Sequence, residues 1–538
     1  MEGKKLKSGC GGPEIINEIK KLYRSGQTDY FLEPIVLTDN NDDPVGLIRD
    51  GDAVIFCCRR GEREIQLTRA FVDPLFKEFP MYEFKNLLFI SMTLYHEMFL
   101  NMPVKVAFPP LSQIKDNLGE TISRSGLRQL RIAESEKFAH ITFFMNGGNN
   151  RPYPGEDDVS VPSPKGVPFE HLPELSAAEV AQETIKGICT GKYDFITANL
   201  ANGDIIGHLE NPEPKIKCAE VVDLQLGNIL EHALAAGYVT IITADHGVLE
   251  QAIKPDGNPN VGHTRNPVPF AIIGPGLKKQ TDPILREDGK LIDIAPTVLQ
   301  IMGLPKPALM NGQSLLTNDA PIPKKTKVLL VILDGWGIGR EDETNPIFMA
   351  DTPVWDRLLR QHPITSLSAS GRAVGLLDGK PGNSEAGHMC IGAGREVPQD
   401  DVRISNAIED GSFFQNPVFL DAIESVKTKN SSLHLISLLS QTSSHGSIDY
   451  PLALLRLAKE KLVKKAYVHL ILDGRSTKVR NAPILLKKLA SDMEKIGLGQ
   501  IASSVGRSFA LDRNGNYQKT RKAYNALVFG LGLRIKCI

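Results

Sequence analysis

Short apolar runs that end in a polar residue recur along the chain. They occupy residues 193–200, 238–244, 328–333, 433–439 and 468–472, and they lead to Asp204, Asp245, Asp334, His445 and Asp473 in that order. Runs that are apolar throughout are typical of strands buried on both faces of a parallel sheet. The pattern therefore predicts several central strands with polar groups at their carboxyl ends.

Amphipathic stretches lie between these runs, and the clearest are residues 215–236 and 353–361. Strand, helix and strand in alternation predict an α/β fold. In such folds ligands collect at the carboxyl ends of the strands, which is where this sequence repeatedly places polar side chains.

The length of 538 residues favours two domains. The proline-rich residues 160–174 (SVPSPKGVPFEHLPE) are interpreted as a domain crossing, and the chain is expected to cross back near residues 394–412. Residues 315–327 (LLTNDAPIPKKTK) are polar and contain two prolines, which is typical of a linker or long loop.

Composition and charge restrict the expected partners and the expected compartment of the protein. The formal net charge of −1 gives no indication of a nucleic-acid or membrane partner. Seven cysteines without zinc-type spacing favour a reducing compartment. The first residues lack the apolar core of a signal peptide, and no apolar run approaches the ~20 residues of a membrane span. A cytoplasmic protein is expected.

Carboxylates and imidazoles after the predicted strands are candidate metal ligands. Asp204 and His208 lie four residues apart, Asp245 and His246 are adjacent, and His263 and Asp334 complete the set. Oxygen and imidazole ligands without thiolates favour Mn²⁺, Zn²⁺ or Mg²⁺. Two such ions ~3.5–4 Å apart form a clamp for phosphoryl displacement.

Ser384 in GNSEAGH lies between glycines that let the backbone turn sharply and present a hydroxyl. A serine needs a base or a metal to act as a nucleophile, and a serine at this place is also typical of a turn or an N-cap. Basic residues that match phosphate or carboxylate geometry, or that form solvated surface, are Arg60, Arg63, Lys137, Arg507 and Arg513.

Six blocks spread over the chain resemble the cofactor-independent phosphoglycerate mutases of the alkaline-phosphatase-like superfamily. They are LDGWG, GNSEAGHMCIGAGR, QLRIAESEKFAHITFFMNGG, TADHG, GHTRNPVPF and GRSFALDRNGNYQKTRKAY. In that family the LDGWG block opens the protein, whereas here the closing half comes first, as in a circular permutation. The resemblance implies a phosphatase-like metal domain over residues 165–410 and a smaller α/β transferase-like domain assembled from residues 1–164 and 411–538.

The resemblance also implies a chemistry. Ser384 would take the phosphate of 3-phosphoglycerate and return it to the 2-hydroxyl, in a monomer with two Mn²⁺ ions, for which Mg²⁺, Co²⁺ or Zn²⁺ could substitute. One ion would be held by Asp204, His208 and His263, and the other by Asp334, Ser384, Asp245 and His246. Phosphate and carboxylate would be bound by Arg60, Arg63, Lys137, Arg507 and Arg513, and glycerate would be oriented by His445, Arg475 and Ser476.

Nearly all departures from the family pattern lie around the residues expected to bind glycerate. Ser476 in DGRS replaces an aspartate, QTSSHGS keeps His445 but loses two glycines, and RRGER replaces the family's sequence near Arg60. Serine cannot carry the charge of an aspartate. Two other hypotheses therefore stay open: a metal-dependent phosphatase or mutase for another small phosphate ester, and a non-catalytic relative that binds metal.

Overall fold

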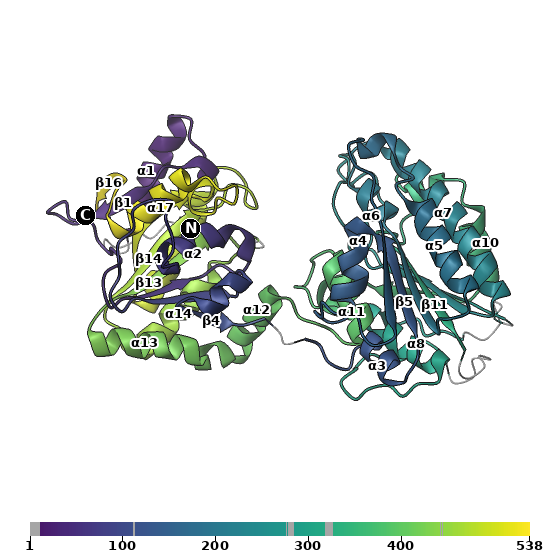
Figure 1. The fold of residues 1–538 in the computed structure, drawn as a ribbon. Helices are drawn as coiled ribbons and strands as arrows, with labels where there is room; N and C mark the ends of the chain where they lie inside the picture. Colours follow the sequence, from purple (N-terminus) through teal and green to yellow (C-terminus); the bar gives the residue numbers. More distant parts are fainter. Residues whose placement is uncertain are drawn as a thin grey trace. The chain divides into compact units, whose positions relative to one another are not determined.

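The computed structural model describes residues 11–110, 113–275, 277, 284–317, 326–441, 443 and 445–537. The chain divides into two compact units, drawn in Figure 1: unit 1 comprises residues 1–110 and 403–538, and unit 2 comprises residues 111–402. Each unit contains one eight-stranded sheet with helices on both faces, which confirms the predicted two-domain α/β fold.

The sheet of unit 2 has the strand order β10-β12-β9-β8-β11-β7-β5-β6. Its central strands β8 (Val239–Thr243), β11 (Val328–Leu333) and β7 (Phe195–Leu200) are neighbours, run parallel and are fully buried. The outer strands are β5 (Gln129–Glu134), β6 (Glu156–Val161), β9 (Val268–Ile273), β10 (Gly289–Lys290) and β12 (Ile364–Ser368).

Helices cover both faces of this sheet. In Figure 1, α5 (Ala177–Cys189), α7 (Pro212–Ala235) and α10 (Pro353–Gln361) lie together on one face. The opposite side carries α3 (Leu118–Arg124), α8 (Ile294–Met302) and α11 (Ser384–Ala393). Shorter helices of the same unit are α4 (Ser135–Ala139), α6 (Asn202–Gly207) and α9 (Pro346–Met349). The strands at 195–200, 239–243 and 328–333 and both amphipathic helices confirm the pattern-based predictions.

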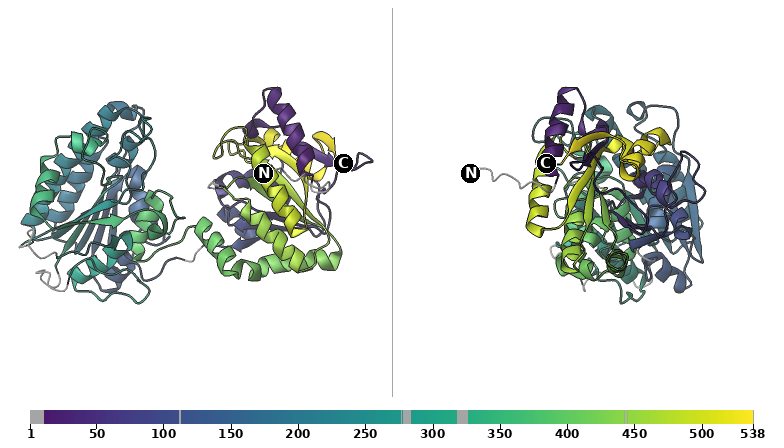
Figure 2. Two further views of the ribbon diagram at one scale, coloured as in Figure 1. Left: turned by 180° about the vertical axis from the view of Figure 1, so that it is seen from behind. Right: turned by 90° about the vertical axis from the view of Figure 1, so that its left-hand side faces the viewer.

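The sheet of unit 1 interleaves strands from the two ends of the chain, in the order β16-β1-β15-β14-β13-β2-β3-β4. The first segment gives β1 (Ile35–Thr38), β2 (Ala53–Phe56), β3 (Leu88–Thr93) and β4 (Val104–Phe108). The second gives β13 (Leu433–Leu439), β14 (Ala466–Leu472), β15 (Gln500–Gly506) and β16 (Leu533–Lys536). Strand β16 pairs in parallel with β1, so strands from the first and the last part of the chain lie in one sheet, where the purple and yellow ribbons of unit 1 run side by side in Figure 2.

Two apolar cores enclose this sheet. Helices α1 (Gly12–Arg24), α13 (Pro417–Lys429), α14 (Asp449–Glu460) and α15 (Ala482–Ile496) contribute to one, and α2 (Gly61–Val72) and α17 (Tyr517–Val528) to the other. The remaining helices are α12 (Asp400–Asp410) and α16 (Arg507–Ala510). Among the described residues, no helix combines the length and apolar character needed to cross a bilayer.

The boundary between the units differs from the expected one. Residues 111–164 were assigned to the transferase-like domain, but β5 pairs in parallel with β7 and β6 pairs with β5, so this segment extends the sheet of unit 2. The proline-rich residues 160–174 therefore lie within one unit and are not a domain crossing. The return crossing falls at residues 402–403, inside the expected range 394–412. The predicted linker at 315–327 lies mostly outside the described residues, and both its flanks belong to unit 2.

Candidate metal centre

Three carboxylates of unit 2 lie at the carboxyl ends of three adjacent strands. Asp245 follows β8, Asp334 follows β11, and Asp204 lies on α6 directly after β7. Because these strands are parallel neighbours in the order β8-β11-β7, their carboxyl ends meet at one edge of the sheet. The topology alone thus brings together residues from positions 204 to 334.

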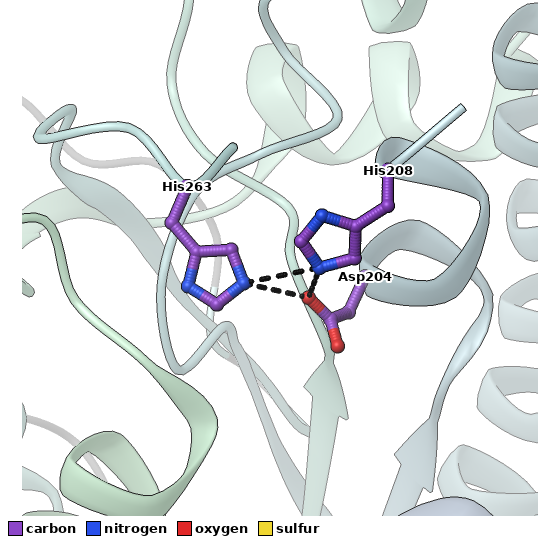
Figure 3. A group of neighbouring side chains, drawn as sticks. All are labelled: Asp204, His208 and His263. Carbon is purple, nitrogen blue, oxygen red and sulfur yellow. Dashed lines mark hydrogen bonds and ion pairs between the residues drawn. The ribbon is translucent and has the colours of Figure 1, made fainter. Parts of the chain in front are cut away.

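Asp204, His208 and His263 form a first group, shown in Figure 3. Asp204 Oδ1 lies 3.3 Å from His208 Nε2 and 3.1 Å from His263 Nε2, and the two imidazole nitrogens are 3.3 Å apart. Around a tetrahedral ion bound at about 2.0–2.1 Å, neighbouring ligand atoms are separated by about 3.3 Å. The three atoms therefore have the spacing of one face of a metal coordination shell.

The other ring nitrogens of this group fix the tautomers. His208 Nδ1 lies 2.8 Å from the carbonyl oxygen of Val261, and His263 Nδ1 lies 2.8 Å from that of Gly382. A ring nitrogen that faces a carbonyl carries the proton and donates it, which leaves each Nε2 with a free lone pair. Both imidazoles are thus prepared as ligands.

Asp245, His246, Asp334 and Ser384 lie next to this group. His246 Nε2 is 3.4 Å from Asp245 Oδ2, 3.7 Å from Asp334 Oδ1 and 2.9 Å from Ser384 Oγ. The same nitrogen is 3.6 Å from Asp204 Oδ1, so the two groups are contiguous. All seven residues predicted as metal ligands converge in unit 2, including the serine hydroxyl.

Ser384 is the first residue of α11, and Asn383 before it caps the helix by accepting a hydrogen bond from the amide of Ala386. The hydroxyl therefore sits at a helix N-terminus, where backbone amides and the helix dipole favour an anion such as phosphate. The capping role is thus filled by the neighbouring asparagine, and the serine side chain points into the carboxylate cluster, 3.3 Å from Asp334 Oδ1.

Lys137 joins the cluster through its amine. Its Nζ lies 2.6 Å from Asp204 Oδ2, 2.6 Å from Asp334 Oδ1 and 2.7 Å from Ser384 Oγ. Burial disfavours the charged form, but the carboxylates of Asp334 and Asp204 raise the pKa of Lys137 above its ordinary value. At neutral pH a buried ammonium group therefore contacts the candidate nucleophile, which the sequence pattern around Lys137 did not reveal.

The carboxylates of this cluster outnumber the ammonium groups that contact them. Burial opposes the ionisation of Asp204, but the neighbouring His208, His263 and Lys137 hold its pKa well below the usual range. Burial and the neighbouring carboxylate of Asp245 raise the pKa of Asp334. Asp204 Oδ1 and Asp245 Oδ2 are buried oxygens without a hydrogen-bond donor among the described residues. Divalent cations fit this donor set.

The candidate substrate residues of unit 1 form a separate group. Burial, together with the charges of Arg507, Arg513 and Arg475, lowers the pKa of the buried Arg63, so three guanidinium groups act on that of Arg63. Arg63 also donates to the carbonyl of Leu511, at 3.2 Å. Clustered arginines of this kind are suited to phosphate and carboxylate.

Buried acids hold parts of this arginine group in place. Arg507 pairs with the buried Asp473, and the same carboxylate accepts a hydrogen bond from the amide of Ser476 at 3.1 Å. His445 Nδ1 lies 3.1 Å from Glu64 Oε1, and both residues are buried. The exposed Arg60 and Arg513 both pair with Glu62, at 3.3 and 2.7 Å. The sequence pattern placed Asp473 after a strand but did not predict its pairing with Arg507, and it did not identify Glu62 or Glu64.

Comparison with known proteins assigns the chain to a family. Residues 37–306, half of the chain, match the Metalloenzyme superfamily. The chain belongs to the metalloenzyme superfamily. Residues 404–536 of this metalloenzyme match a second family, described as the N-terminus of the BPG-independent PGAM.

Curated relatives carry the same name in several organisms. The metalloenzyme is 42% identical over 308 residues to 2,3-bisphosphoglycerate-independent phosphoglycerate mutase 1 of Methanosarcina acetivorans, an alignment of 57% of this chain and 58% of the relative. A mutase of that name from Chloroflexus aggregans is 41% identical over 324 residues, covering 56% and 59%. The chain thus spans less than two thirds of the relatives it matches. A Leishmania mexicana phosphoglycerate mutase structure aligns with 28% identity over 52% of this chain and 53% of that one, with a TM-score of 0.38.

The order of the two family matches is reversed relative to the description of the second. A segment similar to an N-terminus lies at residues 404–536 of the metalloenzyme, after the match at 37–306. The strands of both chain ends interleave in one sheet, and β1 pairs with β16. A circular permutation of the family fold produces this order and this pairing.

Two residues of the centre were missed. His388 is fully buried, with Nδ1 2.9 Å from the carbonyl oxygen of Ser384 and 3.3 Å from Asp245 Oδ2. Asn199 Nδ2 lies 2.7 Å from Asp334 Oδ2 and 3.0 Å from His388 Nε2. His388 lies four residues after Ser384 on α11, the helical spacing that places two side chains on one face, so this signal was available in the motif GNSEAGH.

Proposed function

We propose that the metalloenzyme interconverts 3-phosphoglycerate and 2-phosphoglycerate through a phosphoserine at Ser384. The observation that carries this proposal is the environment of one oxygen atom: Ser384 Oγ lies within 2.7–3.3 Å of Lys137 Nζ, His246 Nε2 and Asp334 Oδ1 at the N-terminus of α11. A buried ammonium group, an imidazole and a carboxylate around one hydroxyl are the surroundings of an activated nucleophile. The names of the relatives supply the substrate class.

Two divalent ions, with Mn²⁺ proposed first, fit the donor set. Asp204, His208 and His263 would hold one, and Asp334, Ser384, Asp245 and His246 the other. When bound, such ions lower the pKa of a coordinated hydroxyl and neutralise charge on a phosphoryl group.

The phosphoryl group is transferred in two halves, first to Ser384 and then from it. Ser384 Oγ loses its proton and forms a bond to phosphorus, while the bond from phosphorus to the 3-oxygen of glycerate breaks and that oxygen takes up a proton. In the second half the 2-hydroxyl loses its proton and attacks the phosphoserine, and Ser384 Oγ leaves and is reprotonated. The ammonium group of Lys137 offsets negative charge at the serine oxygen in both halves.

We further propose that the arginine group of unit 1 binds the anionic groups of the substrate, with His445, Arg475 and Ser476 orienting glycerate. A monomeric enzyme in the cytoplasm, acting on this small molecule alone, is part of the same proposal. A phosphatase is the second candidate, and Ser476 favours it: its hydroxyl, 3.4 Å from Ser443 Oγ, lacks the charge to move a proton for a bound glycerate.

Phosphorus NMR of 3-phosphoglycerate with the Mn²⁺-loaded protein tests these functions together. Formation of 2-phosphoglycerate without any bisphosphoglycerate supports the mutase, whereas release of free phosphate supports the phosphatase. A folded, metal-loaded protein that leaves the substrate unchanged contradicts both. Ser476→Asp should raise the mutase rate about tenfold if this serine merely impairs proton transfer.

A further inference from the structure

A fully buried lysine lies outside the catalytic cluster and serves none of the steps above. Lys215, in the first turn of α7, is 0% exposed, and its Nζ donates to the carbonyl oxygen of Asn260 at 2.8 Å. Among the described residues this carbonyl is the one hydrogen-bond partner of the amine. A buried ammonium group without a carboxylate contact is costly, and an apolar residue of similar length would fill the same space at lower cost.

The partner of Lys215 is the residue that closes a loop. The amide of Asn260 donates to the carbonyl of Ala252 at 2.7 Å, and its side-chain nitrogen donates to the carbonyls of Gln251, at 3.1 Å, and Gly262, at 2.9 Å. Asn260 thus ties both ends of the loop 251–262 together. The Lys215 amine fixes the carbonyl of this same residue from the side of α7.

The closed loop leads directly to the first metal group. The carbonyl oxygen of Val261, next to Asn260, accepts the hydrogen bond from His208 Nδ1, and His263 follows two residues later. The loop therefore sets the tautomer of one candidate ligand and the position of another. A shift at Asn260 would move both imidazoles at once.

We infer that Lys215 is a positioning residue for the first metal ion, acting through Asn260 and Val261 on His208 and His263. This inference rests on the proposed metal centre but names a residue that touches neither the ion nor the substrate. Residues that orient metal ligands from outside the coordination shell typically contribute 10–100-fold to metal affinity.

Lys215→Met tests the inference, because methionine keeps the length and removes the donor. The matched control is Lys217→Met, whose lysine lies two residues on in the same helix, has a side chain 63% exposed and pairs with Glu220. Calorimetric titration with Mn²⁺ should show about a tenfold weaker first ion in Lys215→Met and no change in Lys217→Met. The melting temperature of the metal-free protein should stay equal or rise in Lys215→Met, since a buried charge is removed.

A second readout needs no metal. In ¹⁵N-histidine spectra of the metal-free protein, His208 should lose its single Nδ1–H tautomer in Lys215→Met and retain it in the control. Unchanged affinity together with an unchanged tautomer would overturn the inference. Should Lys215→Met fail to fold, Lys215→Leu also removes the donor, and unchanged affinity there would overturn the inference equally. Both measurements are independent of turnover, so failure of the mutase proposal remains distinguishable by phosphorus NMR.

Discussion

The two units differ in how their buried charged groups are paired. In unit 2 the amine of Lys137 contacts two of the three carboxylates, those of Asp204 and Asp334, and one oxygen each of Asp204 and Asp245 has no donor among the described residues. In unit 1 two buried acids have a basic partner: Asp473 pairs with Arg507 and Glu64 faces His445. The centre of unit 2 therefore has unsatisfied carboxylate oxygens that divalent cations could bind, whereas Asp473 and Glu64 of unit 1 are already paired and the arginine group beside them is suited to an anion.

Loss of the nucleophile is the largest expected effect. Ser384→Ala should lower kcat by at least about 10⁴-fold, because it removes the hydroxyl on which the proposed phosphoenzyme forms. Acid-quenched protein should lose its phosphoserine in mass spectra, while Mn²⁺ still binds to the first group. Ser368→Ala, an exposed serine on β12, serves as the control. Retained turnover would mean that the nucleophile lies elsewhere.

Asp204 connects the two ligand groups of unit 2, so its neutralisation comes next. Asp204→Asn keeps the shape but removes the charge that both His208 and His263 face, and affinity for the first Mn²⁺ should fall by at least about 100-fold. Calorimetric titration measures this, with the exposed Asp351→Asn as the control. An unchanged affinity would show that the convergence of these side chains does not form a cation site.

Metal addition should separate the two units directly. At a hundredfold excess over Kd, a ligand that binds only the folded state stabilises it by about 2.7 kcal/mol. Hydrogen exchange should therefore slow at α6 and α11 of unit 2 on addition of Mn²⁺, and remain unchanged in β13–β15 of unit 1. Equal protection in both units would contradict the contrast drawn between them.

In unit 1 we expect buried acids, and not bound metal ions, to hold the functional side chains in position. Glu64→Gln removes the carboxylate that orients His445, and we expect about a tenfold loss in kcat/KM with unchanged Mn²⁺ affinity. Steady-state kinetics and the metal titration together test this, and Glu78→Gln, an exposed residue of the same unit, is the control. A change in Mn²⁺ affinity would instead show that the Glu64–His445 pair acts on the metal centre of unit 2.

The sequence predicted most of unit 2 because its ligands follow apolar runs that form adjacent parallel strands. Asp204, Asp245 and Asp334 could be identified from local pattern alone, and the fold brought them together. The pairing of Glu64 with His445, the pairing of Asp473 with Arg507 and the contact of Lys137 with Ser384 could not be predicted, since each joins different segments of the chain. The boundary at 160–174 was wrong for the same reason: local proline content says nothing about which sheet β5 and β6 join.

The smallest predicted effect concerns Lys215, a buried charge of unit 2 whose hydrogen-bond partner among the described residues is a neutral carbonyl. Burial lowers the pKa of Lys215 from 10.5 to about 8, although the carboxylate of Glu250 partly opposes this shift. Between these values the unfolded chain holds the proton more tightly than the folded one, so the free energy of unfolding rises with pH across this window. From pH 7 to pH 9 the gain attributable to Lys215 is about 1 kcal/mol.

Urea denaturation of the metal-free protein should show this gain in the wild type and in Lys217→Met but not in Lys215→Met. Parallel slopes in all three proteins would show that the Lys215 amine is solvated and that unit 2 carries no unmatched charge at this position.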